Sequence, residues 1–266
     1  MSERREPGVS VRFRGGGFEP AGRRWASWLA FAAIIALWQA ASSLGLLSPV
    51  AMPSPLSVVH ALRDLAASGK LGLHLGESLF RIGFGWLIGT AAGLAIGLAM
   101  GIFSVARAIG IPITAALFPI PKIALLPLFI LWFGIGEASK VATIALGVFF
   151  PTVISAYSAV DNVPRALIRM GQSFGVPAPS IVAKIVLPGA MPGILAGFRI
   201  SSSIALILVV AAEMIGAEFG IGAFILAAGN LMQTDQLVAG VVVLSLLGLV
   251  ISLVLGQIER RVLRWR

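Results

Sequence analysis

Long apolar segments without charge constrain the fold of this chain more than any other feature. No lysine, arginine, aspartate or glutamate occurs between positions 25 and 62, or between positions 141 and 160. A helix needs about 20 apolar residues to cross the hydrocarbon core of a bilayer. A helix also satisfies its own backbone hydrogen bonds, which a lipid environment demands. These segments therefore predict an all-α, polytopic membrane protein.

The composition supports one membrane domain. Of 266 residues, 58% are hydrophobic and 12% are charged, whereas about 25% are charged in typical soluble domains. The chain has no cysteine, which excludes disulfides and thiolate metal sites. Its two histidines, His60 and His74, are too few for a metal cluster.

Six membrane spans are predicted, at residues 25–46, 82–106, 115–133, 141–160, 189–214 and 236–258. Four prolines between positions 112 and 127 make an ideal continuous helix unexpected there. We expect a short amphipathic surface helix at residues 56–65. Residues 215–235 are expected to form an outer connecting segment.

The basic residues set the predicted orientation. Ten of the twenty lie in the tails, residues 1–24 (expected to be disordered) and 259–266, which flank a transmembrane domain at residues 25–258. With both tails in the cytoplasm, fourteen basic residues lie on that side and four lie outside, leaving out two within the spans. Cytoplasmic loops are enriched in lysine and arginine. The net charge of +9 therefore indicates membrane topology and not nucleic-acid binding.

Residues 161–188 are the longest internal interruption of the apolar pattern. Pro164 suits the first position of a helix, and Gly175 suits a left-handed stop. Apolar residues recur on one face at Ala166, Leu167, Met170 and Phe174. A second short helix is expected to end at Pro188. The pair predicts either an interfacial helix on the bilayer or a docking helix for a soluble partner.

The end of this segment resembles the cytoplasmic signature of bacterial binding-protein-dependent ABC importer permeases. That signature is Glu-Ala-Ala, three residues, Gly, nine residues, Ile-x-Leu-Pro. Here nine residues separate Gly175 from Ile185, with Leu187 and Pro188 completing the pattern. The Glu-Ala-Ala positions hold Arg169, Met170 and Gly171, so the first half departs from the family.

The resemblance runs from about residue 54 to the end and is closest to the sulfonate, taurine and nitrate permeases. It is carried by SLFRIGFGWLIG at 78–89, LLPLFILWFGIGEASK at 125–140, RMGQSFG at 169–175, VLPGAMPGILAGFRI at 186–200 and VVAAEMIGAEFGIG at 209–222. It implies the type I importer fold, with about six transmembrane helices and a cytoplasmic coupling helix.

The resemblance also implies partners. These are an ABC ATPase, an extracytoplasmic solute-binding protein, a second permease copy as a homodimer, and the lipid of a bacterial inner membrane. ATP and Mg would be bound by the ATPase, and no cofactor by this chain. The solute would be a small anion such as a sulfonate, taurine or nitrate. The implied coupling residues are Arg165, Arg169, Met170, Gly171, Phe174, Gly175, Ile185, Leu187 and Pro188.

Five glycines four residues apart form a stripe in the second predicted span, at Gly85, Gly89, Gly93, Gly97 and Gly101. Spacing of four places them on one helix face, where small residues let another helix approach closely. The stripe is either a seam beside the solute pathway or helix packing without a transport role.

Three ionisable residues within the spans are candidates for the solute pathway. Lys122 either snorkels to the interface or lines the path of an anion. Arg199 and Glu213 lie fourteen residues apart in the fifth span, about 21 Å along a helix. They are therefore not expected to pair with each other.

The sequence contains no G-x-x-x-x-G-K-[ST] phosphate loop, no HExxH motif and no GxSxG motif. We therefore do not expect the chain to be an enzyme or to hydrolyse ATP itself. The alternative function is a self-contained secondary carrier or channel. Such a carrier does not require a cytoplasmic helix pair between its fourth and fifth spans.

Overall fold

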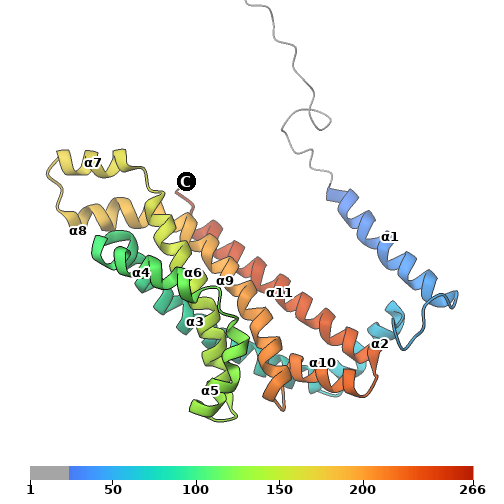
Figure 1. The fold of residues 1–266 in the computed structure, drawn as a ribbon. Coiled ribbons are helices and arrows are strands. Elements are labelled where there is room, and N and C mark those ends of the chain that lie inside the picture. The colour runs from blue at the N-terminus through green and yellow to red at the C-terminus, as the bar shows by residue number, and fades with distance from the viewer. Residues whose placement is uncertain (1–23, 266) are drawn as a thin grey trace, which may run out of the picture.

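The computed structural model describes residues 24–265, so the expected tail at 1–24 lies almost wholly outside the described residues. Every regular element in the described part is helical (Figure 1). Three of its long helices are α3 (Lys70–Ile102), α6 (Glu137–Asp161) and α11 (Thr234–Val262). The fourth runs from Ala178 to Gly216, and all four are long and apolar enough to cross a membrane. The predicted all-α membrane fold is confirmed.

Helix α6 is the centre of the bundle, and the glycine stripe of α3 packs against it. A Cβ atom at Gly89 would lie 2.3 Å from the Ala145 carbonyl oxygen, and one at Gly93 would lie 2.6 Å from that of Phe149. A Cβ atom at Gly85, Gly97 or Gly101 would likewise lie 2.6 to 2.7 Å from a side-chain atom of α6. The stripe is thus a seam within this chain.

Helix α1 (Arg24–Ser43) lies at the first predicted span and stands apart from the bundle (Figure 1). Its 20 residues extend about 30 Å, although its apolar stretch, Trp28–Ser43, is shorter than the other spans. The expected amphipathic helix is present as α2 (Pro55–Ala67), which Ser54 caps by accepting a hydrogen bond from the Ser57 N–H.

The third predicted span, residues 115–133, is not one helix. Helix α4 (Ser104–Leu117) is followed by the 3-10 turn η1 (Lys122–Leu125) and helix α5 (Leu126–Phe133), and the two parts are bent by 86°. Two prolines, at 119 and 121, lie in the break. Because proline has no N–H and clashes with the preceding turn, the helix ends there and the chain turns through about a right angle.

The expected short helix ending at Pro188, and the expected start of the fifth span at residue 189, are both wrong. Helix α8 (Ala178–Ile181) continues through the π-turn η2 (Val182–Val186) into α9 (Leu187–Gly216). A proline inside an α-helix loses one hydrogen bond and clashes with the carbonyl four residues earlier. The wider π-turn directly before Pro188 accommodates it, so the helix is not broken.

Two short helices complete the chain. Helix α7 (Arg165–Ser173) lies between α6 and α8. Helix α10 (Ile221–Asn230) lies within the segment that we expected to be a connection, and its residues Ile221 and Ile225 are buried. The apolar residues at 221–228 indicated a buried element, but the run is too short to distinguish a helix from a loop.

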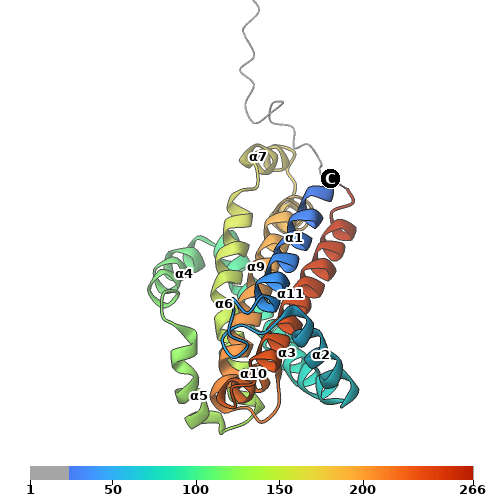
Figure 2. The ribbon, with the colours of Figure 1, turned by 90° about the vertical axis from the view of Figure 1, so that its right-hand side faces the viewer.

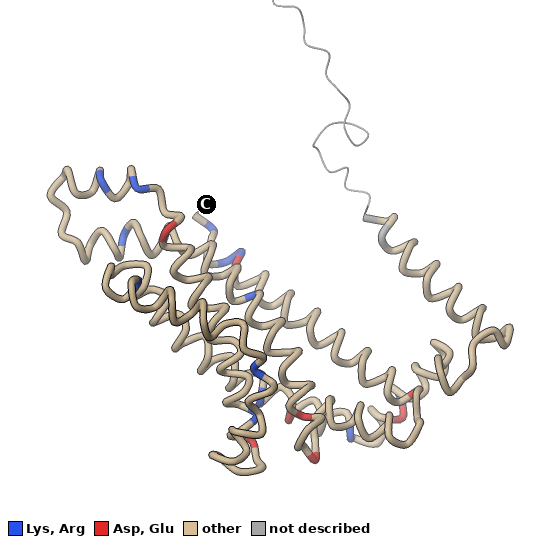
Figure 3. The backbone as a smooth tube through the Cα atoms, in the orientation of Figure 1, with Lys and Arg blue, Asp and Glu red and all other residues tan. Residues whose placement is uncertain are grey.

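The two ends of the bundle differ. Figure 2 shows α7, the start of α1 and the C-terminal end at one end, and α2, α10 and the tip of α5 at the other. Figure 3 shows charged residues concentrated at both ends of the bundle. We call the end of the bundle that carries α7 the α7 end, and the opposite end the far end.

Candidate functional site

Helix α7 projects from the α7 end and is held at its base by two contacts (Figure 1). Val163, directly before it, is buried at 3% exposure in the core below. Asp161, the last residue of α6, forms an ion pair with Arg107 of α4. Pro164 caps the helix, which therefore begins at Arg165, one residue later than expected.

Helix α7 has two apolar faces, and only one of them is covered by this chain. On the inner face, Gly171 is buried, and a Cβ there would lie 3.2 Å from Ile185 and 3.3 Å from Ile181. On the outer face, Met170 is 52% exposed and Phe174 is 80% exposed. Exposure of apolar side chains to water is unfavourable, so the outer face is suited to binding a partner protein.

The turn that follows α7 has the hydrogen bonds of a Schellman motif. The Val176 N–H donates to the Gly171 carbonyl oxygen at 3.0 Å, and the Gly175 N–H donates to that of Gln172 at 2.9 Å. Gly175 has φ +69°, the left-handed value that we predicted. The motif ends α7 and returns the chain to α8.

The α7 surface is basic as well as apolar. Arg165 and Arg169 are exposed on α7, and Lys184 is exposed below it in η2. Among the described residues, no salt bridge involves these three side chains. Ile185, Leu187 and Pro188 are half-buried, and of these three Ile185 lies against Gly171 on the inner face of α7.

A hollow of about 310 Å³ separates α7 from the bundle. Its wall includes Arg165 and Gln172 on one side and Gly101 and Val186 on the other. Helix α7 therefore rests on the bundle through Ile168 and Gly171 and is not packed along its whole length.

The candidate pathway residues all have partners within the chain. Lys122 Nζ donates to three carbonyl oxygens at the end of α4, of Leu117, Phe118 and Ile120, at 2.6 to 3.0 Å. It also lies 4.7 Å from the ring centroid of Phe150. Lys122 thus stabilises the bend between α4 and α5, and its contact with solute stays a prediction.

Arg199 lies near the middle of α9 and Glu213 lies near its C-terminal end, and the two do not pair with each other. Arg199 forms an ion pair with Glu259 of α11 at 2.5 Å. Glu213 is buried and forms an ion pair at 2.7 Å with Arg81 of α3. Sequence reasoning assigned no role to Arg81, because its partners are far away in the sequence. The one local indication of a charge pair was Glu77, which lies four residues before Arg81, about one helical turn.

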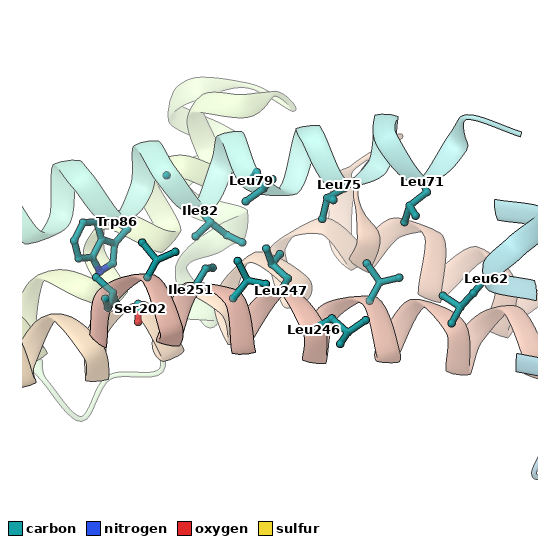
Figure 4. Close-up of a pocket in the computed structure, with 15 residues that line it drawn as sticks. Leu62, Leu71, Leu75, Leu79, Ile82, Trp86, Ser202, Leu246, Leu247 and Ile251 are labelled. Atoms are coloured by element: carbon teal, nitrogen blue, oxygen red, sulfur yellow. The ribbon is translucent and has the colours of Figure 1, made fainter. Parts of the chain in front are cut away.

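An apolar groove runs along the bundle between α3 and α11 (Figure 4). Its volume is about 710 Å³, and its lining includes Leu75, Leu79, Trp86, Leu247 and Ile251. The figure shows these side chains pointing into the space between the two helices. The groove offers almost no polar atoms, so it suits a hydrophobic occupant and not a charged solute.

Comparison with known proteins gives one consistent result. Residues 89–264 match the family described as "Binding-protein-dependent transport system inner membrane component". The chain is 35% identical over 235 residues to the putative aliphatic sulfonates transport permease protein SsuC of Bacillus subtilis, covering 88% of this chain and 85% of that protein. It is also 35% identical over 239 residues to the taurine transport system permease protein TauC of Escherichia coli, covering 88% and 87%.

Solved structures agree on the fold. The chain matches an inward-facing structure of the MetNI methionine ABC transporter with a TM-score of 0.62 and 22% identity. The match covers 71% of this chain and 94% of that chain.

Proposed function

Because the chain belongs to the family of binding-protein-dependent transport system inner membrane components, we propose that it is the permease subunit of an ATP-driven importer for a small organic anion. The observation that carries this proposal is the exposed apolar face of α7, at Met170 and Phe174. That face lies on a helix that projects from one end of the bundle, as a coupling element requires. A self-contained carrier would not require such a face.

The proposed partner of α7 is a separate ATPase that binds ATP and Mg. The chain has no phosphate loop of its own, so in an ATP-driven importer another subunit would hydrolyse the ATP. Arg165 and Arg169 flank the apolar face and would complement acidic residues on the ATPase. When the ATPases close on ATP, α7 would move with them and transmit the motion to α9 through α8.

We propose that a second copy of the chain completes the transporter. Helix α1 stands apart from the bundle, with Trp28 at 76% exposure and Leu37 at 70%. The groove between α3 and α11 presents a further apolar surface. Homodimerisation would cover both and would enclose a pathway between the two copies.

The orientation and solute follow from charge and from the relatives. The α7 end carries Arg165, Arg169, Lys184 and the basic C-terminal tail, so we place it in the cytoplasm of a bacterial inner membrane. An external binding protein would then deliver solute to the far end. The relatives named for aliphatic sulfonates and taurine favour a sulfonate, and nitrate is the alternative anion.

Uptake measurements test this function. Cells with the permease, its ATPase and its binding protein should accumulate radiolabelled taurine or an alkanesulfonate, and excess sulfonate should compete more strongly than nitrate. Replacement of the phosphate-loop lysine of the ATPase should abolish uptake. Undiminished uptake in that variant would show a self-contained carrier instead.

A further inference from the structure

The guanidinium of Arg81 joins three helices at the far end of the bundle. Its Nη1 donates to Glu213 at 2.7 Å and to the Phe219 carbonyl oxygen at 2.6 Å, which holds the end of α9 and the turn before α10. Its Nε and Nη2 donate to the two carboxylate oxygens of Glu137, the first residue of α6, at 2.5 Å and 2.8 Å. Arg81 itself is 2% exposed.

The two carboxylates that bridge Arg81 to other helices differ in their access to water. The Glu213 side chain is 0% exposed and also accepts hydrogen bonds from the Ser78 hydroxyl and the Gly222 N–H. The Glu137 side chain is 43% exposed. Water can therefore solvate Glu137 when it leaves Arg81, whereas Glu213 has no such replacement.

The charge balance also permits only one of these pairs to open. When Glu137 leaves, Arg81 keeps Glu213 as its buried counter-charge, and Glu137 keeps Lys140 at 3.4 Å. No buried charge is left without a partner. When Glu213 leaves, its carboxylate remains buried without a cation, which is costly. The Arg81–Glu137 pair is therefore the one that can open and close.

Glu137 follows a segment whose far end is largely exposed. It directly follows the loop at 134–136, where Gly134 has φ +81° and a Cβ at Gly134 or Gly136 would meet no atom within 4 Å. That loop ends α5, in which Leu131 is 79% exposed and Trp132 is 61% exposed. The buried residues of α5, Leu126 and Phe129, lie in its first half, so the end of α5 next to the glycine loop is its less packed end.

We propose that the Arg81–Glu137 pair is a latch that fixes the far end of α5 to the bundle and opens when the far end of the solute pathway opens. The link between the latch and a solute pathway rests on the proposed function, whereas the latch between Arg81 and Glu137 does not. In the structure described here the latch is closed.

A spin label beside the latch tests its local effect. Because the chain has no cysteine, Ile135→Cys, at a position that is 80% exposed, gives one labelling site per chain. In nanodiscs, Glu137→Gln should raise the ratio of mobile to immobile label about fivefold. Glu137→Asp, which keeps the charge but shortens its reach to Arg81, should shift the ratio in the same direction.

The matched control is Glu77→Gln. Glu77 also pairs with Arg81, at 3.2 Å, and its side chain is 39% exposed, but it lies on the same helix as Arg81 and forms no salt bridge to another helix within residues 24–265. A latch therefore predicts no change in label mobility for Glu77→Gln. Equal effects of Glu77→Gln and Glu137→Gln, or no effect of Glu137→Gln, would overturn the proposal.

A second readout separates the latch from the proposed function. In the complete transporter without binding protein, Glu137→Gln should raise basal ATP hydrolysis several-fold, while Glu77→Gln should leave it unchanged. Unchanged hydrolysis with a mobile label would overturn the link to the pathway. Wild-type transporter without ATP-dependent uptake would instead refute the proposed function, whatever the label shows.

Discussion

At the scale of single residues, Gly175 determines where the coupling helix ends. Its left-handed φ of +69° lets two hydrogen bonds close the turn after α7. Space is not the constraint, since a Cβ there would meet no atom within 4 Å. The requirement is thus one of backbone conformation alone, and a β-branched residue resists it most.

We expect Gly175→Val to leave the permease inserted and folded but to uncouple ATP hydrolysis from uptake. The left-handed conformation costs a residue with a side chain about 1–2 kcal/mol, enough to shift the turn and the direction of α7. The ratio of solute imported to ATP hydrolysed, measured in proteoliposomes, should fall. Gly175→Asn is the matched control, because asparagine tolerates positive φ, and its ratio should stay near that of the wild type.

A second prediction at this scale concerns Glu213. Glu213→Gln removes the buried counter-charge of Arg81, and we expect a loss of about 3–5 kcal/mol in unfolding free energy. Glu259→Gln breaks the partly exposed pair with Arg199, and we expect at most about 1 kcal/mol. Tryptophan fluorescence during denaturation compares the two, and equal losses would show that the buried pair has no special role.

At the scale of elements, glycine spacing shapes the bundle. The stripe of α3 brings its backbone against the carbonyl groups of α6, and Gly193 and Gly197 of α9 approach the other side of α6. In lipid there is little hydrophobic driving force between helices, so such close packing matters more than in water.

Gly93→Leu should destabilise the permease and prevent its assembly with the ATPase. The new side chain would meet the Phe149 carbonyl oxygen and Thr152, and overpacking of this kind costs about 1–3 kcal/mol or more. Gly76→Leu on the same helix is the control, since a Cβ at Gly76 meets no atom within 4 Å. The yield of monodisperse protein should drop for Gly93→Leu alone, and equal yields would contradict the packing account.

Sequence periodicity predicted the long helices but not how they bend. The proline-rich stretch after α4 was expected to depart from an ideal helix, but the sequence did not predict the 86° angle or the hydrogen bonds that Lys122 donates to carbonyl oxygens at the bend. At Pro188 the local rule predicted a break, whereas a π-turn absorbed the proline. Both outcomes depend on tertiary packing, which local propensity does not include.

At the scale of the whole molecule, the two ends of the bundle have different chemistry. The α7 end is basic and carries an exposed apolar helix, while the far end buries Arg81 and Lys140, at 2% and 5% exposure. The sequence predicted which residues lie on α7 and the turn at Gly175. It did not predict the cluster around Arg81, because its partners Glu137 and Glu213 come from distant parts of the chain.

The predicted topology has both termini and α7 in the cytoplasm. Reporter fusions at Gly69, in the turn between α2 and α3, and at Gly175 should therefore report opposite sides of the membrane. The fourteen basic residues against four are the physical reason. Reporters on the same side at both positions would mean that an even number of spans separates them, which would contradict the three crossings of the predicted topology.

The central claim is that α7 couples this permease to an ATPase, and the most direct measurement is co-purification of the ATPase with Phe174→Ala. Phe174 is 80% exposed in the isolated chain, so its loss should not affect folding. As a buried anchor in the complex it would contribute about 1–3 kcal/mol, which lowers ATPase affinity roughly 5- to 150-fold. Ile200→Ala, at an exposed position on α9 away from α7, should retain the ATPase. Wild-type ATPase retention and solute uptake by Phe174→Ala would contradict the account.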